Sequence, residues 1–240
     1  MKRKTYQTCL ILYLLFISLY YRASAQSGAN DVTFNSLDNV IHFSSGISKT
    51  LLQPDGKIVM VADKSVIRLN ADKTIDNNFN VGLLNGLVYS LALQSDGKII
   101  LAGNFTSHNG TSRIRIIRLN ANGSIDASFS TTGTGFNDRI ECVLIQTDGK
   151  IIVAGEFTNY NSISHNRIAR LNTDGTLDTS FIVGTGFNST VYAMSLQTDG
   201  KIIVGGNFGS YNGTSRIRIA RLNADGSLST GFNGAGPNGV

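Results

Sequence analysis

The sequence is poor in several residue types. Of its 240 residues none is tryptophan, 2 are proline, 2 are cysteine and only 15% are charged, whereas about a quarter of an average soluble domain is charged. The two cysteines stand far apart in the chain, which excludes a metal site built from paired cysteines. Glycine, by contrast, occurs 26 times. Low charge with many glycine, asparagine, serine and threonine residues is typical of short strands joined by tight turns.

The first 25 residues have the three parts of a secretory signal peptide. Lys2–Lys4 are basic, residues 9–21 are apolar, and Ala23-Ser24-Ala25 is typical of a cleavage site. The apolar part is shorter than the roughly 20 residues that a membrane-spanning helix needs, which favours a signal peptide over a transmembrane anchor. We therefore expect a mature chain that starts at Gln26, has no membrane span, and is secreted or displayed at the cell surface.

Most of the formal charge lies in this N-terminal segment. The net charge is +5, but residues 1–25 hold four basic residues and no acidic one, which leaves 17 basic against 16 acidic residues. Because a nearly neutral chain has no basic surface, we expect no nucleic-acid partner. Cys142 is the one cysteine that follows the signal peptide. Ser90 and Ala193 occupy its place in other repeats, so we expect a small buried residue rather than a reactive thiol.

One ten-residue segment occurs four times. QTDGKIIVAG at residues 146–155 returns as QTDGKIIVGG at 197–206, and earlier versions begin at Gln94 and Gln53, so the copies are 41, 52 and 51 residues apart. Two further markers follow each copy in the same order, which indicates a tandem array of one structural unit. The markers are the arginine of Arg-Leu-Asn (Arg68, Arg118, Arg170, Arg221) and a phenylalanine (Phe79, Phe129, Phe181, Phe232).

Each unit is predicted to contain four antiparallel strands. In the second unit these are residues 88–94, 98–105, 113–120 and 125–129, which are rich in β-branched residues. Asp-Gly or Asn-Gly separates the first strand from the second and the third from the fourth. These dipeptides are typical of two-residue hairpins in which both turn positions have positive φ. No helix is expected after residue 25.

Such units predict an all-β fold, a β-propeller whose blades are four-stranded antiparallel sheets. We expect a signal peptide at residues 1–25 and propeller repeats in residues 26–240. A lone strand at residues 31–35 resembles the last strand of a further unit, so the four repeats, each of about 51 residues, are expected to be part of a larger ring. The alternatives are a closed ring of four blades and a β-solenoid. The repeats are predicted at about residues 47–79, 88–129, 140–181 and 191–232.

Three segments carry a resemblance to a known family. They are LQTDGKIIVGGNF at residues 196–208, RIARLNADGSL at 218–228 and LDTSFIVGTGFN at 177–188. They resemble the delta-60 repeat family of secreted bacterial β-propellers, and the resemblance covers residues 31–240. It implies a propeller within a large secreted or surface protein and supplies no catalytic residues. The first repeat departs from the pattern by lacking about ten residues after its second strand, and the fourth has Ser229 in place of a recurring aspartate.

Few residues in the predicted channel could perform chemistry. The first strand of each blade lines the channel, and apart from tyrosine only Lys49 and Glu141 are ionisable there. A channel metal site needs a ring of histidines or carboxylates. We therefore expect no metal, no cofactor and no enzymatic activity. The lack of tryptophan argues against quinone-dependent propeller dehydrogenases, and the glycine motif at residues 234–239 has no helix after it to bind a dinucleotide.

The alternative function is that of a propeller enzyme, either a polysaccharide lyase or a hydrolase, or of an accessory propeller in a larger surface enzyme. Acidic or histidine residues contributed by further blades would favour it.

The recurring aspartates allow two interpretations. The loops at residues 172–178 and 223–229 resemble calcium loops faintly, but calcium takes six to eight oxygen ligands, more than these turns offer. Asp76, Asp126 and Asp178 are expected instead to pair with the recurring arginine or to cap a turn. Recurrence favours a structural role because every repeat must meet its neighbour in the same way. By the same reasoning Phe105, Phe157 and Phe208 are expected to be packing residues.

The candidate binding residues lie between the second and third strands. An aromatic residue followed by asparagine occupies one equivalent place in three repeats. Aromatic rings beside amides suit stacking and hydrogen bonding to sugars or polar peptides, so the expected partner of this non-catalytic scaffold is a glycan or an extracellular protein. The alternative is that these loops only satisfy their own backbone. The candidate residues are His108, Asn109, Tyr160, Asn161, Tyr211 and Asn212.

Overall fold

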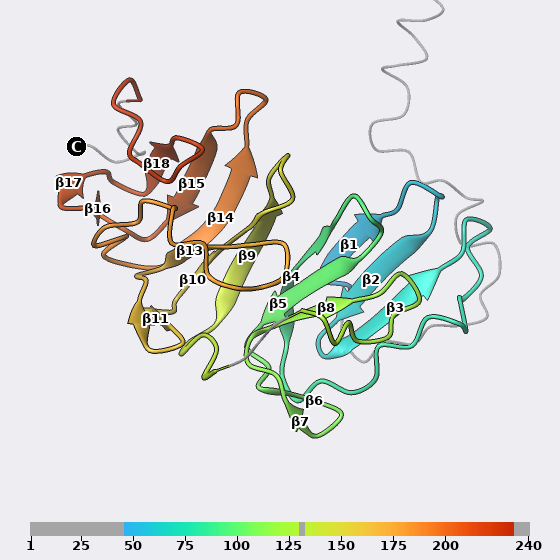
Figure 1. Cartoon of the computed structure of the whole chain (residues 1–240). Helices are drawn as coiled ribbons and strands as arrows, with labels where there is room; N and C mark the ends of the chain where they lie inside the picture. The colour runs from blue at the N-terminus through green and yellow to red at the C-terminus, as the bar shows by residue number, and fades with distance from the viewer. Residues whose placement is uncertain (1–45, 130–132, 233–240) are drawn as a thin grey trace, which may run out of the picture. The chain divides into compact units, whose positions relative to one another are not determined.

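The computed structural model of the chain describes residues 46–129 and 133–232 (Figure 1). This part consists of strands and turns, and none of its segments is a helix of the length and apolarity needed to cross a membrane. The predicted signal peptide, the lone strand at residues 31–35 and the glycine motif at residues 234–239 lie outside the described residues.

Each repeat forms one three-stranded antiparallel sheet whose middle strand pairs with both of the others. In the third repeat, for example, Ile152 lies opposite Leu144 on one side and Arg170 on the other. The predicted all-β architecture of repeated antiparallel blades is thereby confirmed. The four sheets are β1 (Lys49–Leu52), β2 (Ile58–Ala62) and β3 (Ser65–Leu69); β4 (Val88–Leu93), β5 (Ile99–Gly103) and β8 (Ile116–Leu119); β9 (Ile140–Ile145), β10 (Ile151–Gly155) and β13 (Ile168–Leu171); and β14 (Val191–Leu196), β15 (Ile202–Gly206) and β18 (Ile219–Leu222).

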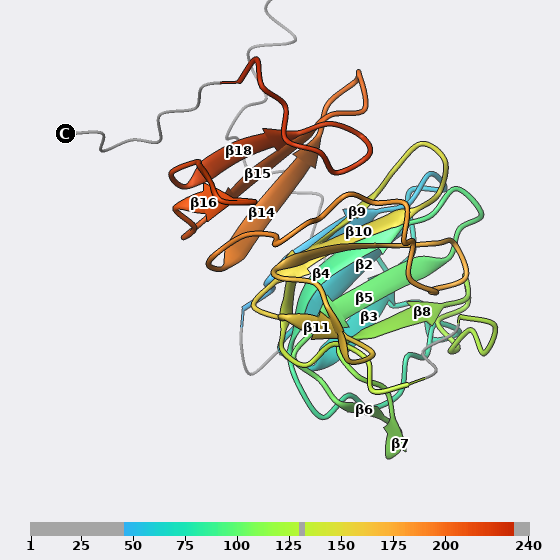
Figure 2. The same ribbon diagram turned by 60° about the vertical axis from the view of Figure 1, so that its left-hand side comes forward.

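The last three repeats add a short hairpin where a loop was expected. It follows the middle strand and therefore lies at the end of the sheet where that strand finishes (Figure 2). The first repeat has a tight connection through Asp63 and Lys64 instead, because it lacks the corresponding residues. The short hairpins are β6 (Ser107–His108) with β7 (Thr111–Ser112), β11 (Asn159–Tyr160) with β12 (Ile163–Ser164), and β16 (Ser210–Tyr211) with β17 (Thr214–Ser215).

The predicted outer strand of each blade makes only one bridge pair. In the second repeat Leu119 pairs with Ile125, and equivalent bridges occur in the other three repeats. The side chain of Asp126 then accepts a hydrogen bond from the backbone nitrogen of Ser128 over 2.9 Å, and the nitrogen of Phe129 bonds back to the oxygen of Asp126. This local turn competes with continued strand pairing. Each blade is therefore three strands plus a bridged segment.

The Asp-Gly hairpins differ from the predicted two-residue type. Only the glycine has positive φ, which is 83° at Gly149, whereas Asp148 does not. The backbone nitrogen of Gly149 bonds to the oxygen of Gln146, and the nitrogen of Gln146 bonds to the oxygen of Lys150. This pattern is a type I turn followed by a glycine bulge. The expectation of positive φ at both turn positions was therefore wrong.

In the second and third repeats both faces of the middle strand are covered by neighbouring repeats. All five residues of β10 are buried. Ile151 and Val153 belong to the hydrophobic cluster shared with the second repeat, while Ile152 and Ala154 belong to the cluster shared with the fourth. A strand buried on both faces is continuously apolar rather than alternating, which explains the recurring Lys-Ile-Ile segment.

The first strands of successive repeats contact one another, β1 with β4, β4 with β9 and β9 with β14. Cys142 in β9 packs against the cluster between the third and fourth repeats. Burial raises the pKa of its thiol to about 12, so the thiol is protonated and unreactive at neutral pH. This agrees with the prediction of a small packing residue.

A glycine at the end of each of the last three middle strands allows the sheet to form a bulge. At Gly206 the pairing with β14 shifts, because Gly206 lies opposite Val191 and Gly205 lies opposite Ala193. A Cβ atom on Gly206 would lie 2.2 Å from the backbone oxygen of Thr190, whereas one on Gly205 would meet nothing closer than 3.9 Å.

These two neighbouring glycines give a matched test. Gly206→Ala is expected to lower the free energy of unfolding by about 2 kcal/mol, because backbone must move to admit the methyl group. Gly205→Ala should change it by less than about 0.5 kcal/mol, since alanine already stands at the equivalent positions 102 and 154. Denaturant unfolding followed by circular dichroism measures both, and equal losses would contradict the role assigned to Gly206.

Candidate functional site

The aromatic residues expected to bind a ligand lie inside the fold. Tyr160 is 2% exposed, Tyr211 is fully buried and His108 is 7% exposed. The hydroxyl of Tyr211 donates to the backbone oxygen of Gly226 over 2.7 Å, and burial raises the pKa of this hydroxyl. The ring packs against Phe187 with 4.5 Å between the ring centroids. Stacking on a ligand requires an exposed ring face, and the structure does not provide one at these three positions.

The short hairpins explain why these rings point inward. Tyr160 pairs through its backbone with Phe136, and Tyr211 pairs with Phe187, so each hairpin is held against the connection between two repeats. The hydroxyl of Tyr160 donates to the backbone oxygen of Gly175 over 2.9 Å, and Nε2 of His108 contacts the backbone oxygen of Val81. The phenylalanine three residues before each of these rings was predicted to be a packing residue. This is confirmed, since Phe105, Phe157 and Phe208 are at most 1% exposed.

The asparagines that follow these rings also have structural bonds. Asn109, Asn161 and Asn212 have positive φ between 47° and 49°, a conformation that asparagine tolerates better than most residues. The side-chain oxygen of Asn161 accepts a hydrogen bond from the nitrogen of Gly135 over 2.8 Å, and that of Asn212 accepts one from Gly186 over 2.9 Å. The six predicted binding residues therefore connect consecutive repeats in this structure.

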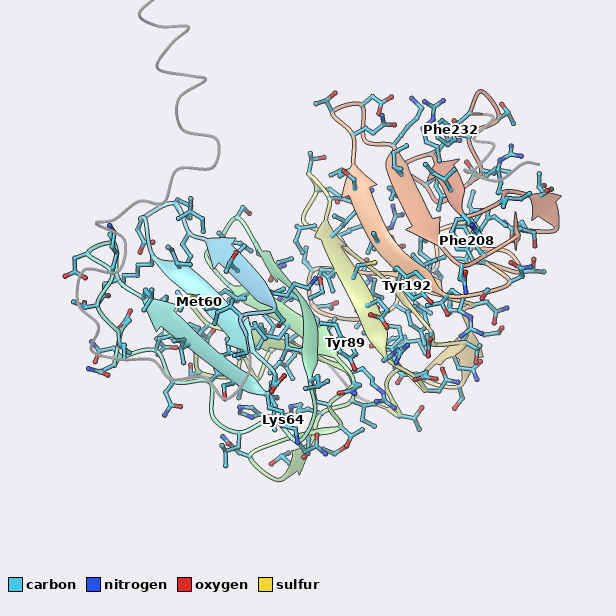
Figure 3. The ribbon with its side chains drawn as sticks, turned by 180° about the vertical axis from the view of Figure 1, so that it is seen from behind. Met60, Lys64, Tyr89, Tyr192, Phe208 and Phe232 are labelled. Atoms are coloured by element: carbon cyan, nitrogen blue, oxygen red, sulfur yellow. The ribbon has the colours of Figure 1, made fainter. Side chains whose placement is uncertain are left out.

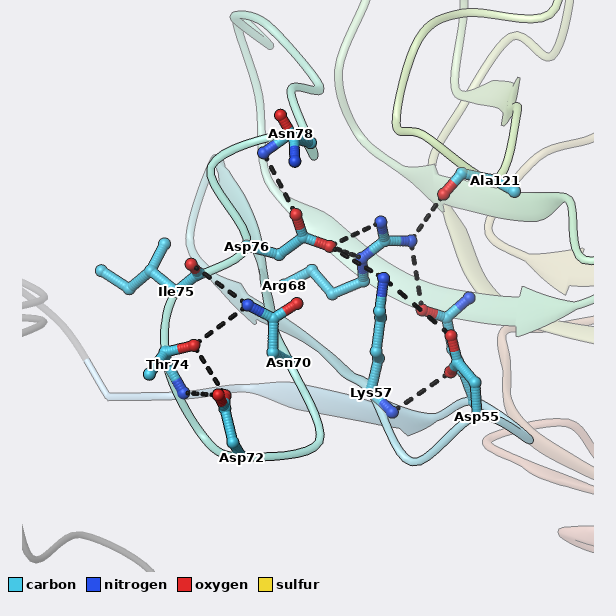
Figure 4. A network of polar contacts seen from close by, with 11 residues as sticks. Asp55, Lys57, Arg68, Asn70, Asp72, Thr74, Ile75, Asp76, Asn78 and Ala121 are labelled. Carbon is cyan, nitrogen blue, oxygen red and sulfur yellow. Dashed lines mark hydrogen bonds and ion pairs between the residues drawn. The ribbon is translucent and has the colours of Figure 1, made fainter.

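The recurring arginine forms the main polar contact between repeats (Figure 4). Arg68 contacts Asp76 of its own repeat at 2.7 Å and donates to the backbone oxygen of Ala121 in the next repeat over 2.5 Å. Arg170 repeats both contacts, with Asp178 and with the oxygen of Ala224, each at 2.7 Å. Each of these arginines also lies over a phenylalanine ring, at 4.4 Å and 4.7 Å from the centroid. The predicted pairing of aspartate with arginine is confirmed.

These aspartates stay ionised although they are buried. Burial by itself would raise the pKa of Asp178, but hydrogen bonds from Lys150, Ser180 and Arg170 outweigh it and hold the pKa well below its ordinary value. Asp126 behaves in the same way. In the first three repeats the lysine after the Asp-Gly turn also contacts this aspartate, as Lys150 contacts Asp178 at 2.7 Å. We call the arginine, its aspartate, this lysine and the carbonyl oxygen of the next repeat the arginine clamp.

The oxygens of the loop at residues 172–178 are used within the turn. The side chain of Asp174 accepts hydrogen bonds from the nitrogen and the hydroxyl of Thr176, at 2.9 Å and 2.7 Å. Asp178 belongs to the arginine clamp. In the described residues no three side chains of histidine, cysteine, aspartate or glutamate are grouped closely enough to hold a metal ion. The geometry therefore gives no support to a calcium site in this turn.

A hollow opens at the end of the sheets opposite to the short hairpins, where the Asp-Gly hairpins of the first three repeats meet. Its volume is about 660 Å³, which is within the usual range for small-molecule sites. Leu93 at the end of β4 and Ile145 at the end of β9 give it an apolar lining. Ser95 and Thr147 contribute hydroxyls from equivalent hairpins. The sequence analysis missed this site because the hairpins are far apart in the chain. The repeated Gln-Xaa-Asp-Gly motif marks the hairpins that line the hollow, but it does not show that they meet in space.

The charged groups of the hollow are paired with one another. Lys57 lies 4.0 Å from Asp55 and 3.2 Å from Asp76, which also holds Arg68. The side-chain oxygen of Gln53 accepts a hydrogen bond from Arg68 over 3.3 Å. The hollow therefore has little net charge and suits a neutral ligand better than an ionic one.

A second polar group lies at the start of β9 and just after the end of β10. Arg139 contacts Glu141 at 2.6 Å and Glu156 at 2.8 Å. Burial is the main reason that the pKa of Glu141 is raised, and Arg139 opposes the shift. Tyr192 on β14 is 51% exposed. The predicted channel residue Glu141 is thus part of an ion-pair network.

The repeated sheets, joined face to face by the arginine clamps, define a β-propeller repeat protein. The family described as "Domain of unknown function (DUF5122) beta-propeller" matches residues 53–79, 94–129, 146–181 and 197–232, more than half of the chain. The chain belongs to this family. The comparison with curated proteins gives no match.

Solved structures show the same fold. The chain is similar to the WD40 β-propeller domain of Doa1, with a TM-score of 0.51 and 18% sequence identity, over 75% of this chain and 51% of that one. It is also similar to the extracellular domain of the putative one component system BT4673 from B. thetaiotaomicron, with a TM-score of 0.51, 15% identity, and coverage of 78% and 24%. The chain thus spans about half or less of each of these two structures.

Removing one carboxylate from a clamp should destabilise the propeller. Asp178→Asn is expected to lower the free energy of unfolding by about 3 kcal/mol, because Arg170 and Lys150 lose their counter-charge in a buried setting. Asp174→Asn is the control. That carboxylate bonds only within an exposed turn, so the change should cost less than about 1 kcal/mol. Equal costs in denaturant unfolding would contradict the importance of the clamp.

The same carboxylates predict a pH dependence. Their pKa values are lowered in the folded chain, so below about pH 4 the unfolded chain binds protons that the folded chain does not. The stabilisation that these carboxylates contribute should therefore be complete above about pH 4. The free energy of unfolding should then fall as the pH decreases below this value. Asp178→Asn should make this fall shallower. An unchanged slope in the variant would contradict the assignment.

Proposed function

We propose that this chain is a secreted or surface-displayed, non-catalytic β-propeller that serves as a binding scaffold. The signal-like pattern of residues 1–25 supports export. The observation that carries the binding role is the hollow of about 660 Å³ that equivalent hairpins of three repeats form together.

The lining of the hollow indicates the chemistry of its ligand. Paired charges favour a neutral ligand, Leu93 and Ile145 offer an apolar surface, and the hydroxyls of Ser95 and Thr147 offer hydrogen bonds. These features fit a neutral segment of a glycan or of an extracellular protein that has both apolar and hydrogen-bonding groups. The binding place proposed from the structure is therefore at the opposite end of the sheets from the residues first suggested by the sequence.

Filling the hollow tests this function. In Ser95→Trp with Thr147→Trp two large side chains would occupy the space. Thr198→Trp is the matched control, because Thr198 holds the equivalent hairpin position in the fourth repeat and does not line the hollow. Thermal unfolding is measured with neutral oligosaccharides, such as cello-, xylo- and chito-oligosaccharides, and with neutral peptides.

A ligand at about 100 times its dissociation constant should stabilise the wild type and Thr198→Trp by about 2.7 kcal/mol and should not stabilise the filled variant. Binding that survives in the filled variant would move the site elsewhere. Absence of any stabilising ligand would instead favour a propeller that acts only as a rigid spacer.

An enzymatic function is the second candidate, and Glu141 is the observation that favours it. A partly buried carboxyl group with a raised pKa is suited to donate a proton. Glu156, which follows β10, shares Arg139 with Glu141, and exposed Tyr192 lies on β14. A polysaccharide hydrolase or lyase would need such a group. We rank this function second because Arg139 binds both carboxylates and leaves neither unpaired.

Glu141→Gln distinguishes the two functions. If the chain is an enzyme, this change should abolish release of reducing ends or of unsaturated uronates from polysaccharides. If it is a scaffold, wild type and variant should both release none above background, and ligand binding in the hollow should be unchanged.

A further inference from the structure

The first and fourth described repeats each have one sheet face that no other described repeat covers, whereas the corresponding faces of the second and third repeats are buried. At each described junction, one face of a repeat is covered by the next repeat. In the third repeat this face contains Ile152, Ala154 and Ile168, each 0% exposed. In the fourth repeat the equivalent residues, Ile203, Gly205 and Ile219, are only half-buried. We call this surface the fourth-repeat face.

The first repeat shows the complementary pattern. In the second repeat, the face toward the preceding repeat contains Ile99, Leu101 and Ile117, which are at most 1% exposed. The equivalent residues of the first repeat, Ile58, Met60 and Ile67, are half-buried; Figure 3 labels Met60 on β2. We call this surface the first-repeat face. Neither face contains a charged residue at these positions.

The arginine clamp is incomplete at the same two places. Arg68, Arg118 and Arg170 each donate to a backbone oxygen in the following repeat. Among the described residues Arg221 donates to Ser229 and lies over the ring of Phe232, but it donates to no backbone oxygen of another repeat. It is also less buried than the other three arginines. The equivalent acceptor in the first repeat is the backbone oxygen of Ala71, to which no described side chain donates. Within the part of the chain that the structure describes, a donor on the fourth repeat and an acceptor on the first repeat thus lack the inter-repeat partner that their equivalents have.

We propose that the fourth-repeat face of one copy of this chain docks onto the first-repeat face of a second copy. The contact would continue the interface that already joins the four repeats, with Ile203 and Ile219 packed against Ile58 and Met60. Arg221 would then donate to the oxygen of Ala71 in the second copy. Such a contact is head-to-tail, so an open assembly of any length keeps one free first-repeat face at one end and one free fourth-repeat face at the other.

Two variants test the proposal together. Ile203→Glu places a charge on the fourth-repeat face, and Met60→Glu places one on the first-repeat face. Because both side chains are half-exposed within one copy, each variant should keep the circular dichroism spectrum of the wild type. Burying an unpaired carboxylate at the junction should weaken self-association at least tenfold. Ile163→Glu, at an exposed position on β12, is the control and should associate like the wild type.

Sedimentation velocity over a range of concentrations measures the assemblies. The wild type should sediment as more than one copy at micromolar concentration, and each glutamate variant should sediment as a single copy. An equal mixture of the two variants should form a species of two copies, because one intact face of each kind remains. Arg221→Ala should weaken the wild-type association.

A wild-type chain that stays a single copy at all concentrations would overturn the proposal. So would self-association of Met60→Glu by itself, because that result would mean pairing of like faces. The equal mixture is also a control for misfolding of the variants, since only correctly folded copies can form the complex of two.

Discussion

The arginine clamp is the interaction on which this structure most depends. A guanidinium group is buried between repeats, and it is tolerated there because its own repeat supplies an aspartate and the next repeat supplies a carbonyl oxygen. The aspartate alone would pay a large cost for burial. It is ionised because a lysine and backbone groups bond to it as well. One group of residues thus satisfies the polar atoms within a repeat and fixes how the next repeat packs against it.

This constraint accounts for much of the sequence pattern. Arginine, aspartate and phenylalanine recur at fixed distances because they meet in space, with the ring beneath the guanidinium. The middle strands β5 and β10 are apolar on both faces because each is covered on both sides by neighbouring repeats. Where the pattern weakens, as at Ser229 and Arg221 in the fourth repeat, the structure loses the same contacts. The regular spacing of these residues therefore reflects the interface between repeats rather than a functional site.

The blades, their number in this chain and the pairing of Asp178 with Arg170 could be predicted because they follow from local periodicity and from recurrence. The positions of Tyr160 and Tyr211 could not, because their burial depends on how a short hairpin packs against a connection that precedes it by more than twenty residues. The same recurrence that indicated a structural role for Phe157 applied to these tyrosines and should have been given more weight. The hollow was also beyond the sequence, since Ser95 and Thr147 are brought together only by the stacking of repeats.

A double-mutant cycle between Arg170 and Asp178 would test this account most directly. Arg170→Met, Asp178→Asn and the double variant are compared by denaturant unfolding. If the clamp is a buried charge pair, each single change leaves one charge without its partner. The loss of stability in the double variant should then be smaller than the sum of the two single losses by at least about 1 kcal/mol. Losses that simply add would mean that the two residues act independently and would contradict the clamp as the interaction that joins the repeats.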